Sequence, residues 1–478
     1  MRIEQIGSRS ERLPRAQRLR RRLLAALSLA FLACTQNLQY RSAQDAVEPV
    51  ASSGPPAWFG VIEFDDHGFY WDRAQLTRVV ETIRSATREG AARNREALVF
   101  VFVHGWNHNA EPADRNLVSA RALVGALARA EEDSEIGDHR PVVGIYLAWR
   151  GKRVNPPWLR FTSYWNRNAG AVRVGTSLAL GDALREILDA TKSQSAGGNP
   201  NSRVVAVGHS MGSVVLQEAM AGLLPNATVA GDRDDGSGID VSGRRSPSFP
   251  DLVVLLNSAA SSLQALQIVE HLESHGVRRL VTRKQELYRG PLLVSLTSES
   301  DRATSALFRF GKALDPYRGG FRREREEPFP HSQRDFYFTS DGHNRELWTH
   351  RLVRANRDAT VCPNGKRPEG DEIAPALLRN AYRYRRLGTI GEELRGFEID
   401  LACRADSSLA ERYRFERIED ARNRSAFWFA HLPREIVDGH GDIFGNPALL
   451  QLVVALADLS SVFEPAQSRA AAGAQRTE

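Results

Sequence analysis

The chain of 478 residues is poor in several residue types that mark particular protein classes. It has only three cysteines, with no Cys-x-x-Cys pair and no zinc-ligand spacing, so we predict no structural metal. Lysine occurs only at positions 152, 192, 284, 312 and 366, and nearly all of the positive charge therefore comes from arginine. No internal repeat is visible, which argues against the repeat architectures.

The first 34 residues have the pattern of an export signal. Arginines precede an apolar stretch at 23–33 that is interrupted only by Ser28. This stretch is shorter than the roughly 20 residues needed to span a bilayer, but it suits the core of a signal peptide. It ends in Phe31-Leu32-Ala33-Cys34, which resembles a bacterial lipobox and implies that Cys34 is the lipidated first residue of the mature protein. An ordinary secretory signal or a short uncleaved anchor is the alternative.

We therefore expect an exported lipoprotein that is anchored to the membrane, in the periplasm or at the outer membrane. Thr35 stands where an aspartate would imply retention at the inner membrane, so the resemblance favours the outer membrane. Residues 1–34 carry eight arginines and two acids, which equals the net charge of +6 of the whole chain. The mature chain is thus formally neutral, and its composition does not support binding to nucleic acid.

Cys362 and Cys403 remain if Cys34 carries the lipid. In an oxidising compartment they could form a disulfide across an excursion of about 40 residues, which would stabilise the fold by roughly 3–4 kcal/mol. Two unpaired thiols are the alternative.

From residue 56 onward, apolar runs typical of buried strands alternate with amphipathic helical stretches. An opening hairpin is expected at 61–64 and 68–71. Further strands are expected at 97–103, 141–147, 203–207, 251–257, 291–297 and 426–430, and helices at 74–93, 116–131, 171–191, 213–220 and 447–459. This alternation predicts an α/β fold with a doubly wound, mostly parallel sheet.

The pattern divides the chain into a signal peptide at 1–34, a tether at 35–55, one α/β domain at 56–462 and a frayed tail at 463–478. Within the domain, residues 302–425 lack clean alternation and carry a run of mixed charges at 322–327. We interpret them as a long insertion before the last strand, partly loop. Residues 231–249 are rich in Gly, Asp and Ser and predict a surface loop.

The most informative motif is Gly208-His209-Ser210-Met211-Gly212, which reads as G-x-S-x-G. It follows a β-branched strand and precedes a helical pattern, as a nucleophile elbow does. Gly208 and Gly212 allow the strained turn and the close passage of the two backbones. Ser210 is then the candidate nucleophile, and the amide of Met211 lies at a helix N-terminus, where an oxyanion would form. A serine that only caps the helix is the alternative.

His104-Gly105-Trp106-Asn107 directly follows the apolar strand 97–103. Together with the elbow, this turn resembles the α/β-hydrolase superfamily, and most of all bacterial hydrolases of esterase or lipase type that carry an HGW or HGY turn. The resemblance covers residues 60 to 460, apart from the insertion. It implies that the Trp106 amide is the second oxyanion donor, that Gly105 permits the sharp turn, and that His104 supports the turn.

The same resemblance implies an acidic residue just past the strand 291–297. Asp301 and Glu299 are both candidates, and Asp301 falls a few residues past the strand end, where the family has its aspartate. An exposed carboxylate that caps the following helix is the alternative for either residue.

The histidine should follow the last strand, and His440 lies there between two glycines. His343 is the rival. Choosing it would leave the C-terminal strand and helix without a role. His108 precedes the serine and is disfavoured, and His431 is expected in the core or at a strand end.

These residues imply a serine hydrolase that cleaves carboxylic esters through an acyl-enzyme, without a cofactor. The expected partners are a small-molecule or lipid ester as substrate and the membrane through the lipid anchor. A serine peptidase or acyltransferase on the same fold, or a non-catalytic lipoprotein that uses the fold as a binding module, is the alternative. Aromatic residues at 149–168 either line an acyl pocket or pack beneath a cap.

Overall fold

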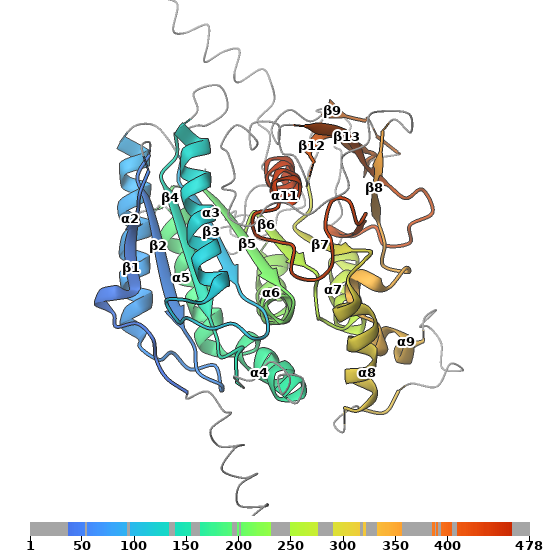
Figure 1. Ribbon diagram of the computed structural model, residues 1–478, viewed down its shortest axis with the longest axis horizontal. Helices are drawn as coiled ribbons and strands as arrows, with labels where there is room; N and C mark the ends of the chain where they lie inside the picture. The colour runs from blue at the N-terminus through green and yellow to red at the C-terminus, as the bar shows by residue number, and fades with distance from the viewer. Residues whose placement is uncertain are drawn as a thin grey trace, which may run out of the picture.

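The computed structural model describes residues 37–52, 55–92, 96–132, 139–153, 163–193, 198–199, 202–230, 249–275, 290–315, 319–321, 332–355, 385–387, 389–390, 393–403 and 409–460. Twelve strands form one sheet in the order β1-β2-β4-β3-β5-β6-β7-β14-β8-β13-β12-β9 (Figure 1). The strands are β1 (Val47–Val50), β2 (Ala57–Glu63), β3 (Leu98–Val103), β4 (Val142–Ala148), β5 (Arg203–His209), β6 (Leu252–Leu256), β7 (Leu293–Ser298), β8 (His350–Arg354), β9 (Arg385–Arg386), β12 (Gly396–Ala402), β13 (Ala410–Arg417) and β14 (Phe427–Leu432). β10 (Thr389–Ile390) and β11 (Glu393–Leu394) form a separate two-stranded ribbon.

The centre of the sheet is parallel, from β2 through β14 to β8. Antiparallel pairs occur only toward its two edges, where β1 pairs with β2 and where β13, β12 and β9 extend the sheet beyond β8. The expectation of an α/β fold with a mostly parallel sheet is thereby confirmed.

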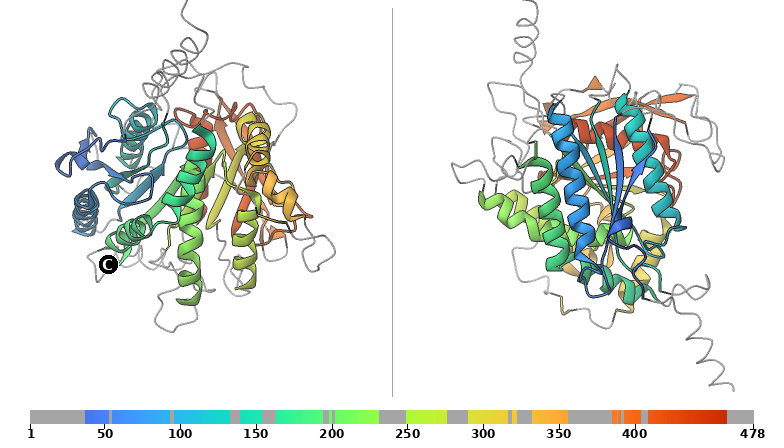
Figure 2. Two further views of the ribbon diagram at one scale, coloured as in Figure 1. Left: turned by 90° about the horizontal axis from the view of Figure 1, so that it is seen from below. Right: turned by 90° about the vertical axis from the view of Figure 1, so that its left-hand side faces the viewer.

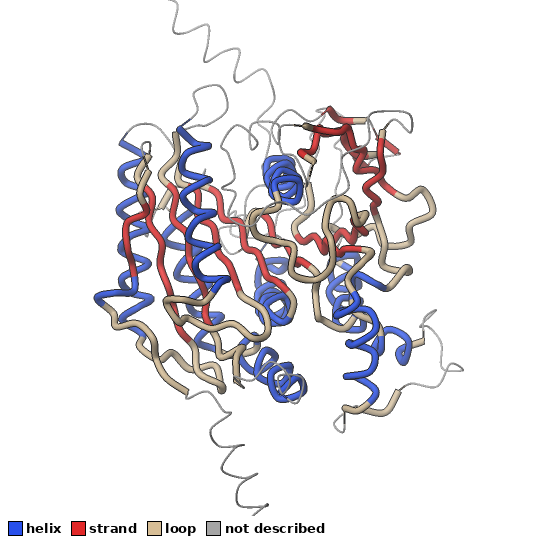
Figure 3. The backbone as a smooth tube through the Cα atoms, in the orientation of Figure 1, coloured by secondary structure: helices blue, strands red, loops and turns tan. Residues whose placement is uncertain are grey.

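Helices cover both faces of this sheet, as Figures 2 and 3 show. They are α2 (Arg73–Ala92), α3 (Arg115–Glu132), α4 (Tyr164–Gly175), α5 (Leu178–Lys192), α6 (Met211–Ala230), α7 (Ser262–Ser274), α8 (Phe308–Ala313), α9 (Gln333–Phe338) and α11 (Pro447–Ser460), with short helical turns η1 (Gln44–Ala46), η4 (Ala303–Leu307) and η5 (Asp341–His343). One apolar core packs α2, α5, α6 and α7 on the first face, and a second core packs α3 and α11 on the other. The central strands are buried along their whole length, as expected for parallel strands covered on both faces.

The strand order reverses between β3 and β5. After β3 the chain crosses to β4 on one side, and after β5 it crosses to β6 on the other. In open α/β sheets, ligands bind outside the carboxyl ends of the strands at such a switch point. The residues that follow Val103 and His209 lie at this switch point.

The expected tether at 35–55 is corrected by the structure, because most of it is part of the fold. Residues 47–50 form β1, which pairs with β2. The Glu63 carboxylate, at the end of β2, accepts hydrogen bonds from the backbone amides of Tyr40 (2.9 Å) and Arg41 (2.9 Å). Backbone pairing with an otherwise open sheet edge explains why this polar segment is ordered.

Two further expectations are corrected, and a third is made more specific. The single helix at 171–191 is two helices, α4 and α5, because Ser177 caps the start of α5 by accepting from the amide of Leu180. The opening hairpin is reduced to one bridge between Phe64 and Tyr70, since β2 pairs with β1 and β4 instead. The insertion 302–425 contributes strands β8, β9, β12 and β13 to the main sheet, so it is more than a loop.

Several expectations concern residues outside the described ones: the signal peptide with Cys34, the loop at 231–248, Cys362, and the tail at 463–478. Cys403 is described, and it is buried and disulfide-bonded. Within the described ranges, no helix has both the length and the apolar character that crossing a membrane requires.

Candidate active site

Three side chains meet beyond the carboxyl ends of β5, β7 and β14, although they are far apart in the sequence. Ser210 Oγ lies 2.8 Å from His440 Nε2, and His440 Nδ1 lies 2.9 Å from Asp301 Oδ2. Since a buried carboxylate accepts, Nδ1 carries the proton and donates to Asp301, and Nε2 accepts from the Ser210 hydroxyl. The result is one continuous hydrogen-bonded chain from a hydroxyl through an imidazole to a carboxylate.

Ser210 stands on a strained turn. Its φ is +55°, a left-handed conformation that is uncommon for a residue with a side chain. The turn is held from both sides, because the amide of Ser210 donates to the Leu256 carbonyl and its own carbonyl accepts from the amide of Ala259. Strain of this kind persists only where the surroundings enforce it, and it occurs at functional sites.

The glycines around this turn are required by close backbone contacts. A Cβ on Gly212 would lie 2.5 Å from the carbonyl oxygen of His104, and closer still to that of Val103. A Cβ on Gly208 would lie 2.8 Å from the carbonyl oxygen of Gly212, and one on Gly105 would lie 2.9 Å from Cβ of Ser210. The turn after β3 and the turn after β5 are thus packed directly against each other, with no room for side chains.

Asp301 is buried and saturated with hydrogen-bond donors. Besides His440, it accepts from the amides of Ala303 and Thr304 and from the Thr304 hydroxyl (2.6 Å). Burial alone would raise the pKa of Asp301, but the hydrogen bond from His440 and those from Thr304 outweigh it, so the pKa lies below its ordinary value. Asp301 is therefore an ionised acceptor that orients the imidazole. Glu299 makes no such contact, and its carboxylate accepts from the backbone amide of Arg434.

The loop that carries His440 is fixed by groups at the ends of three strands. The amide of the Asn257 side chain donates to the carbonyls of Gly439 (3.0 Å) and His440 (2.9 Å), while its oxygen accepts from the amide of Ser298. His209 Nε2 donates to the same His440 carbonyl at 2.9 Å. Burial lowers the pKa of His209 to about 3, so it is neutral and can serve as this fixed donor.

Serine side chains at the end of β7 and just after it complete this support. The Ser300 hydroxyl accepts from the amide of Gly439 at 2.8 Å, and the Ser298 hydroxyl donates to the Val437 carbonyl at 2.6 Å. Sequence reasoning missed Asn257, His209 and these serines as positioning residues. The available signal was the polar Asn257-Ser258 pair directly after the apolar strand 252–256. Asparagine is one of the residues that tolerate a left-handed backbone, and Asn257 has a φ of +44° in the structure.

The turn 104–107 borders the same site. His104 is fully buried, and its Nε2 accepts from the amide of Trp149 while its carbonyl accepts from the Trp149 indole. Burial lowers the pKa of His104 to about 4, so it stays neutral and supports the turn. The Trp106 side chain lies away from the turn and donates to the Ser163 hydroxyl. The amide of Met211 is one of the first donors of α6, which have no acceptor within the helix.

The remaining histidines named from the sequence lie outside this chain of hydrogen bonds. His108 pairs with Asp114 at 3.0 Å. His343 Nε2 lies 3.2 Å from the Thr304 hydroxyl, and its Nδ1 lies 3.3 Å from His431. His343 therefore stands behind Asp301 and does not contact Ser210.

A buried carboxylic acid lies on the inner side of the site. Asp341 is fully buried, and burial raises its pKa to about 7 despite hydrogen bonds from Ser258 and the amide of Gly342. Its backbone amide donates to the carbonyl of Ala260. The segment that follows Asn257 is thus tied to the insertion, although Asp341 does not touch the three central side chains.

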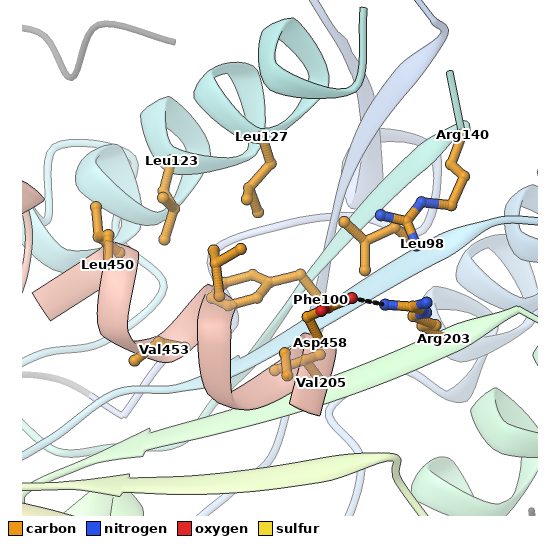
Figure 4. Close-up of a pocket in the computed structure, with 12 residues that line it drawn as sticks. Leu98, Phe100, Leu123, Leu127, Arg140, Arg203, Val205, Leu450, Val453 and Asp458 are labelled. Carbon is orange, nitrogen blue, oxygen red and sulfur yellow. Dashed lines mark hydrogen bonds and ion pairs between the residues drawn. The ribbon is translucent and has the colours of Figure 1, made fainter. Parts of the chain in front are cut away.

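A cavity of about 60 Å³ lies elsewhere, between α3, α11 and the amino ends of β3 and β5 (Figure 4). Its lining is mainly Leu, Val and Phe, and Arg203 pairs with Asp458 beside it. Because Ser210 follows the carboxyl end of β5, this cavity is at the opposite end of the strand. Among the described side chains, no group of three or more His, Cys, Asp and Glu is placed to hold a metal.

Comparison with known proteins adds little. No family model and no curated protein matches the chain. An uncharacterized protein from Pseudomonas aeruginosa, known from a crystal structure, is similar at 12% identity with a TM-score of 0.23. The similarity covers 51% of this chain and 42% of that protein, so the chain spans less than half of its length. A likeness this weak carries no argument about fold or function.

Proposed function

We propose that the protein is a serine hydrolase of the α/β-hydrolase type that cleaves carboxylic esters through an acyl-enzyme. The observation that carries the proposal is the continuous chain from Ser210 Oγ through His440 to Asp301, with distances of 2.8 and 2.9 Å. A nucleophile within hydrogen-bond reach of a base, and a base oriented by a third group, is the arrangement that nucleophilic catalysis needs. Its position at the switch point of a parallel sheet supports the same proposal.

In the proposed reaction, Ser210 Oγ attacks the ester carbonyl carbon while His440 Nε2 takes the hydroxyl proton. Asp301 holds the imidazole in the tautomer that can accept this proton and stabilises the imidazolium. The amides of Trp106 and Met211 donate to the oxyanion, and each such donor contributes roughly 3–4 kcal/mol in enzymes where one was removed. His440 then protonates the leaving alcohol, which leaves an ester on Ser210.

Water completes the reaction. His440 removes a proton from a water molecule, the resulting hydroxide attacks the acyl carbon, and Ser210 regains its proton as the carboxylic acid leaves. No step of this scheme needs a cofactor. We also propose, from the sequence, that the protein is exported and tethered by a lipid on Cys34.

The proposal is tested by labelling the purified protein with a fluorophosphonate probe and identifying the modified peptide. Labelling at Ser210 that is lost in His440→Ala would support a working serine nucleophile. A folded protein without labelling would contradict the proposal and favour a binding module on the same fold. His108→Ala is the matched control, because His108 pairs with Asp114 and should label at the wild-type rate.

A further inference from the structure

The edge of the sheet that carries the candidate active site also carries most of the exposed large apolar side chains among the described residues. These are Leu38 (51% exposed), Phe69 (70%), Leu178 (92%), Leu307 (63%), Phe310 (62%) and Leu314 (53%). We call these six residues the apolar edge. Contiguous exposed apolar surface on a soluble protein marks a binding surface more often than isolated exposed residues do.

Three members of the apolar edge form one face of a helix. Leu307 is the last residue of η4, Phe310 lies within α8, and Leu314 is the C-cap residue of α8. Their spacing of i, i+3 and i+7 makes them project on the same side. The inner side of the same segment is buried at Thr304, Phe308 and Gly311, and Phe308 is its large apolar side chain. With Phe308 packed inside, Leu307, Phe310 and Leu314 make the outer face apolar as well, whereas the outer face of a surface helix is ordinarily polar.

The other members lie at the same edge on different elements. α8 packs on α4, where the Trp165 indole donates to the carbonyl of Gly311 (2.8 Å). Leu178 is the first residue of α5, which comes shortly after α4 in the chain. Phe69 is held near it, because the hydroxyl of the next residue, Tyr70, donates to the Ala179 carbonyl. Figure 1 shows α4 and α8 together at the lower edge of the molecule.

The charges beside the helix face are basic. Arg302 and Arg309 are exposed in the same segment, and no acidic residue occurs from 303 to 313. Lys312 is partly buried over the ring of Tyr337, and Asp315 and Glu218 offset its charge, so the two arginines supply the exposed positive charge. Apolar side chains flanked by arginine suit the headgroup region of an anionic bilayer.

The start of the described chain lies at the same edge. Asn37 and Leu38 line a small hollow together with Ala110, Trp149 and Arg150, which follow the carboxyl ends of β3 and β4. Leu38 is four residues beyond Cys34, the residue expected to carry lipid. Four extended residues reach about 14 Å, so a lipid on Cys34 would keep this edge close to the headgroups.

From these observations we infer that the apolar edge docks on an anionic lipid bilayer and turns the candidate active site toward it. The exposed apolar residues come from separate loops and helices, so they match a flat, extended surface better than a single peptide or groove. Adjacent basic residues provide the complementary charge for anionic headgroups. This docking surface does not depend on the proposed esterase activity, since none of its members belongs to the Ser210–His440–Asp301 chain.

The inference is tested with the mature chain, residues 34–478, carrying Cys34→Ser so that no lipid is attached. The described sheet and its helices lie within this chain. It should co-sediment with vesicles of phosphatidylethanolamine and phosphatidylglycerol, and bind less to phosphatidylcholine vesicles or at high salt. The triple variant L307S, F310S, L314S should bind at least about tenfold more weakly, because three large apolar side chains no longer leave water on binding.

Leu409→Ser is the matched control. Leu409 is also exposed (44%), but it precedes β13 at the far side of the sheet, so this variant should bind as the parent does. An environment-sensitive nitrobenzoxadiazole dye attached at Phe310→Cys should brighten when vesicles are added, and the same dye at Leu409→Cys should not. A dye response at both positions or at neither would contradict docking through this edge.

Two other results would overturn the inference. One is equal vesicle binding by the parent and the triple variant. The other is a change of oligomeric state in the triple variant without any vesicle binding by the parent, which would assign the face to a second copy of the chain. Ser210→Ala should bind vesicles as the parent does, so a failure of fluorophosphonate labelling and a failure of docking are separate results.

Discussion

Replacing Asn257 by aspartate removes the two hydrogen bonds that hold the His440 loop, with almost no change in side-chain size. The side-chain amide of Asn257 donates to the carbonyls of Gly439 and His440 at 3.0 and 2.9 Å. In Asn257→Asp an oxygen faces both carbonyls, while the bond from the amide of Ser298 is kept. Aspartate also tolerates the left-handed φ of +44° at this position, so the substitution should not add backbone strain.

The expected loss follows from these contacts. Two buried hydrogen bonds contribute about 1–3 kcal/mol together, and repulsion between the new oxygen and the two carbonyls adds to that, so the free energy of unfolding should fall by about 2–4 kcal/mol. The larger effect is on the site. A shift of the His440 imidazole by about 1 Å would lower the rate of Ser210 labelling by a fluorophosphonate about 100-fold.

Asn423→Asp is the matched control for this prediction. Asn423 is buried at the amino end of β14, where its side-chain amide donates to the carbonyl of Phe427 at 2.9 Å. This variant should lose a similar amount of stability by urea unfolding, and it should label at the wild-type rate wherever it is folded. If Asn257→Asp labels within about threefold of wild type while His440→Ala does not label, the reasoning about the loop is wrong.

Asp301→Asn should slow Ser210 labelling by about four orders of magnitude, because an amide favours the wrong imidazole tautomer. Glu299→Gln should label normally, because glutamine keeps a side-chain oxygen that can accept from the amide of Arg434. Gly212→Ala should lower the free energy of unfolding by about 3 kcal/mol or more, since the new Cβ would meet the carbonyls of Val103 and His104. Gly222→Ala, where a Cβ meets nothing within 4 Å, should instead be neutral or slightly stabilising, and equal urea midpoints for the two variants would contradict the packing argument. The raised pKa of Asp341, about 7, means that the native state keeps a proton that the unfolded chain loses near pH 4. The free energy of unfolding should therefore fall by about 4 kcal/mol between pH 4 and 7 relative to Asp341→Asn, and then level off; parallel pH profiles of the two proteins would refute this.

Much of the fold was predictable because parallel strands in the middle of a sheet have a distinctive composition. β3 is Leu-Val-Phe-Val-Phe-Val, and all six residues are buried. Strands of this kind cannot alternate between polar and apolar residues, since both faces are covered by helices. The central strands were therefore found within a few residues of their ends. The helices were found less well, because α6 continues to Ala230, α7 was not expected, and the division between α4 and α5 depends on a single serine cap.

The strands of the insertion were harder to recognise. β13 alternates between exposed or half-exposed and buried positions, and it is rich in arginine and glutamate. β13 pairs with β8 and β12, and in the sequence the stretch between these two strands includes residues 356–384, which lie outside the described residues. Pairing between distant, charged strands is decided by the partner, and a local pattern does not show it.

Part of the candidate site was likewise predictable from the sequence, and part of it needed the tertiary structure. Sequence alone singled out Ser210 through its glycines and the strand and helix around it. The resemblance to the α/β-hydrolase superfamily then limited the acid to Asp301 or Glu299. The choice between these two carboxylates needed the tertiary structure, because only the burial of Asp301 and its distance to His440 distinguish them. The sequence marked Asn257 only as a polar residue after an apolar strand. Its support of the His440 loop needed the tertiary structure, since the carbonyls to which it donates are about 180 residues away.

The sequence by itself determined the class of the fold and the strained turn at Ser210, because these depend on local composition and on glycine. The short list of side chains that could act with Ser210 followed from the resemblance of its motifs to the α/β-hydrolase superfamily. Only the tertiary structure decided which acid and which histidine meet the serine, that residues 47–50 complete the sheet, and that exposed apolar residues from separate elements share one edge. Such contacts join distant parts of the chain, and they arise when the whole sheet is assembled rather than from any local pattern.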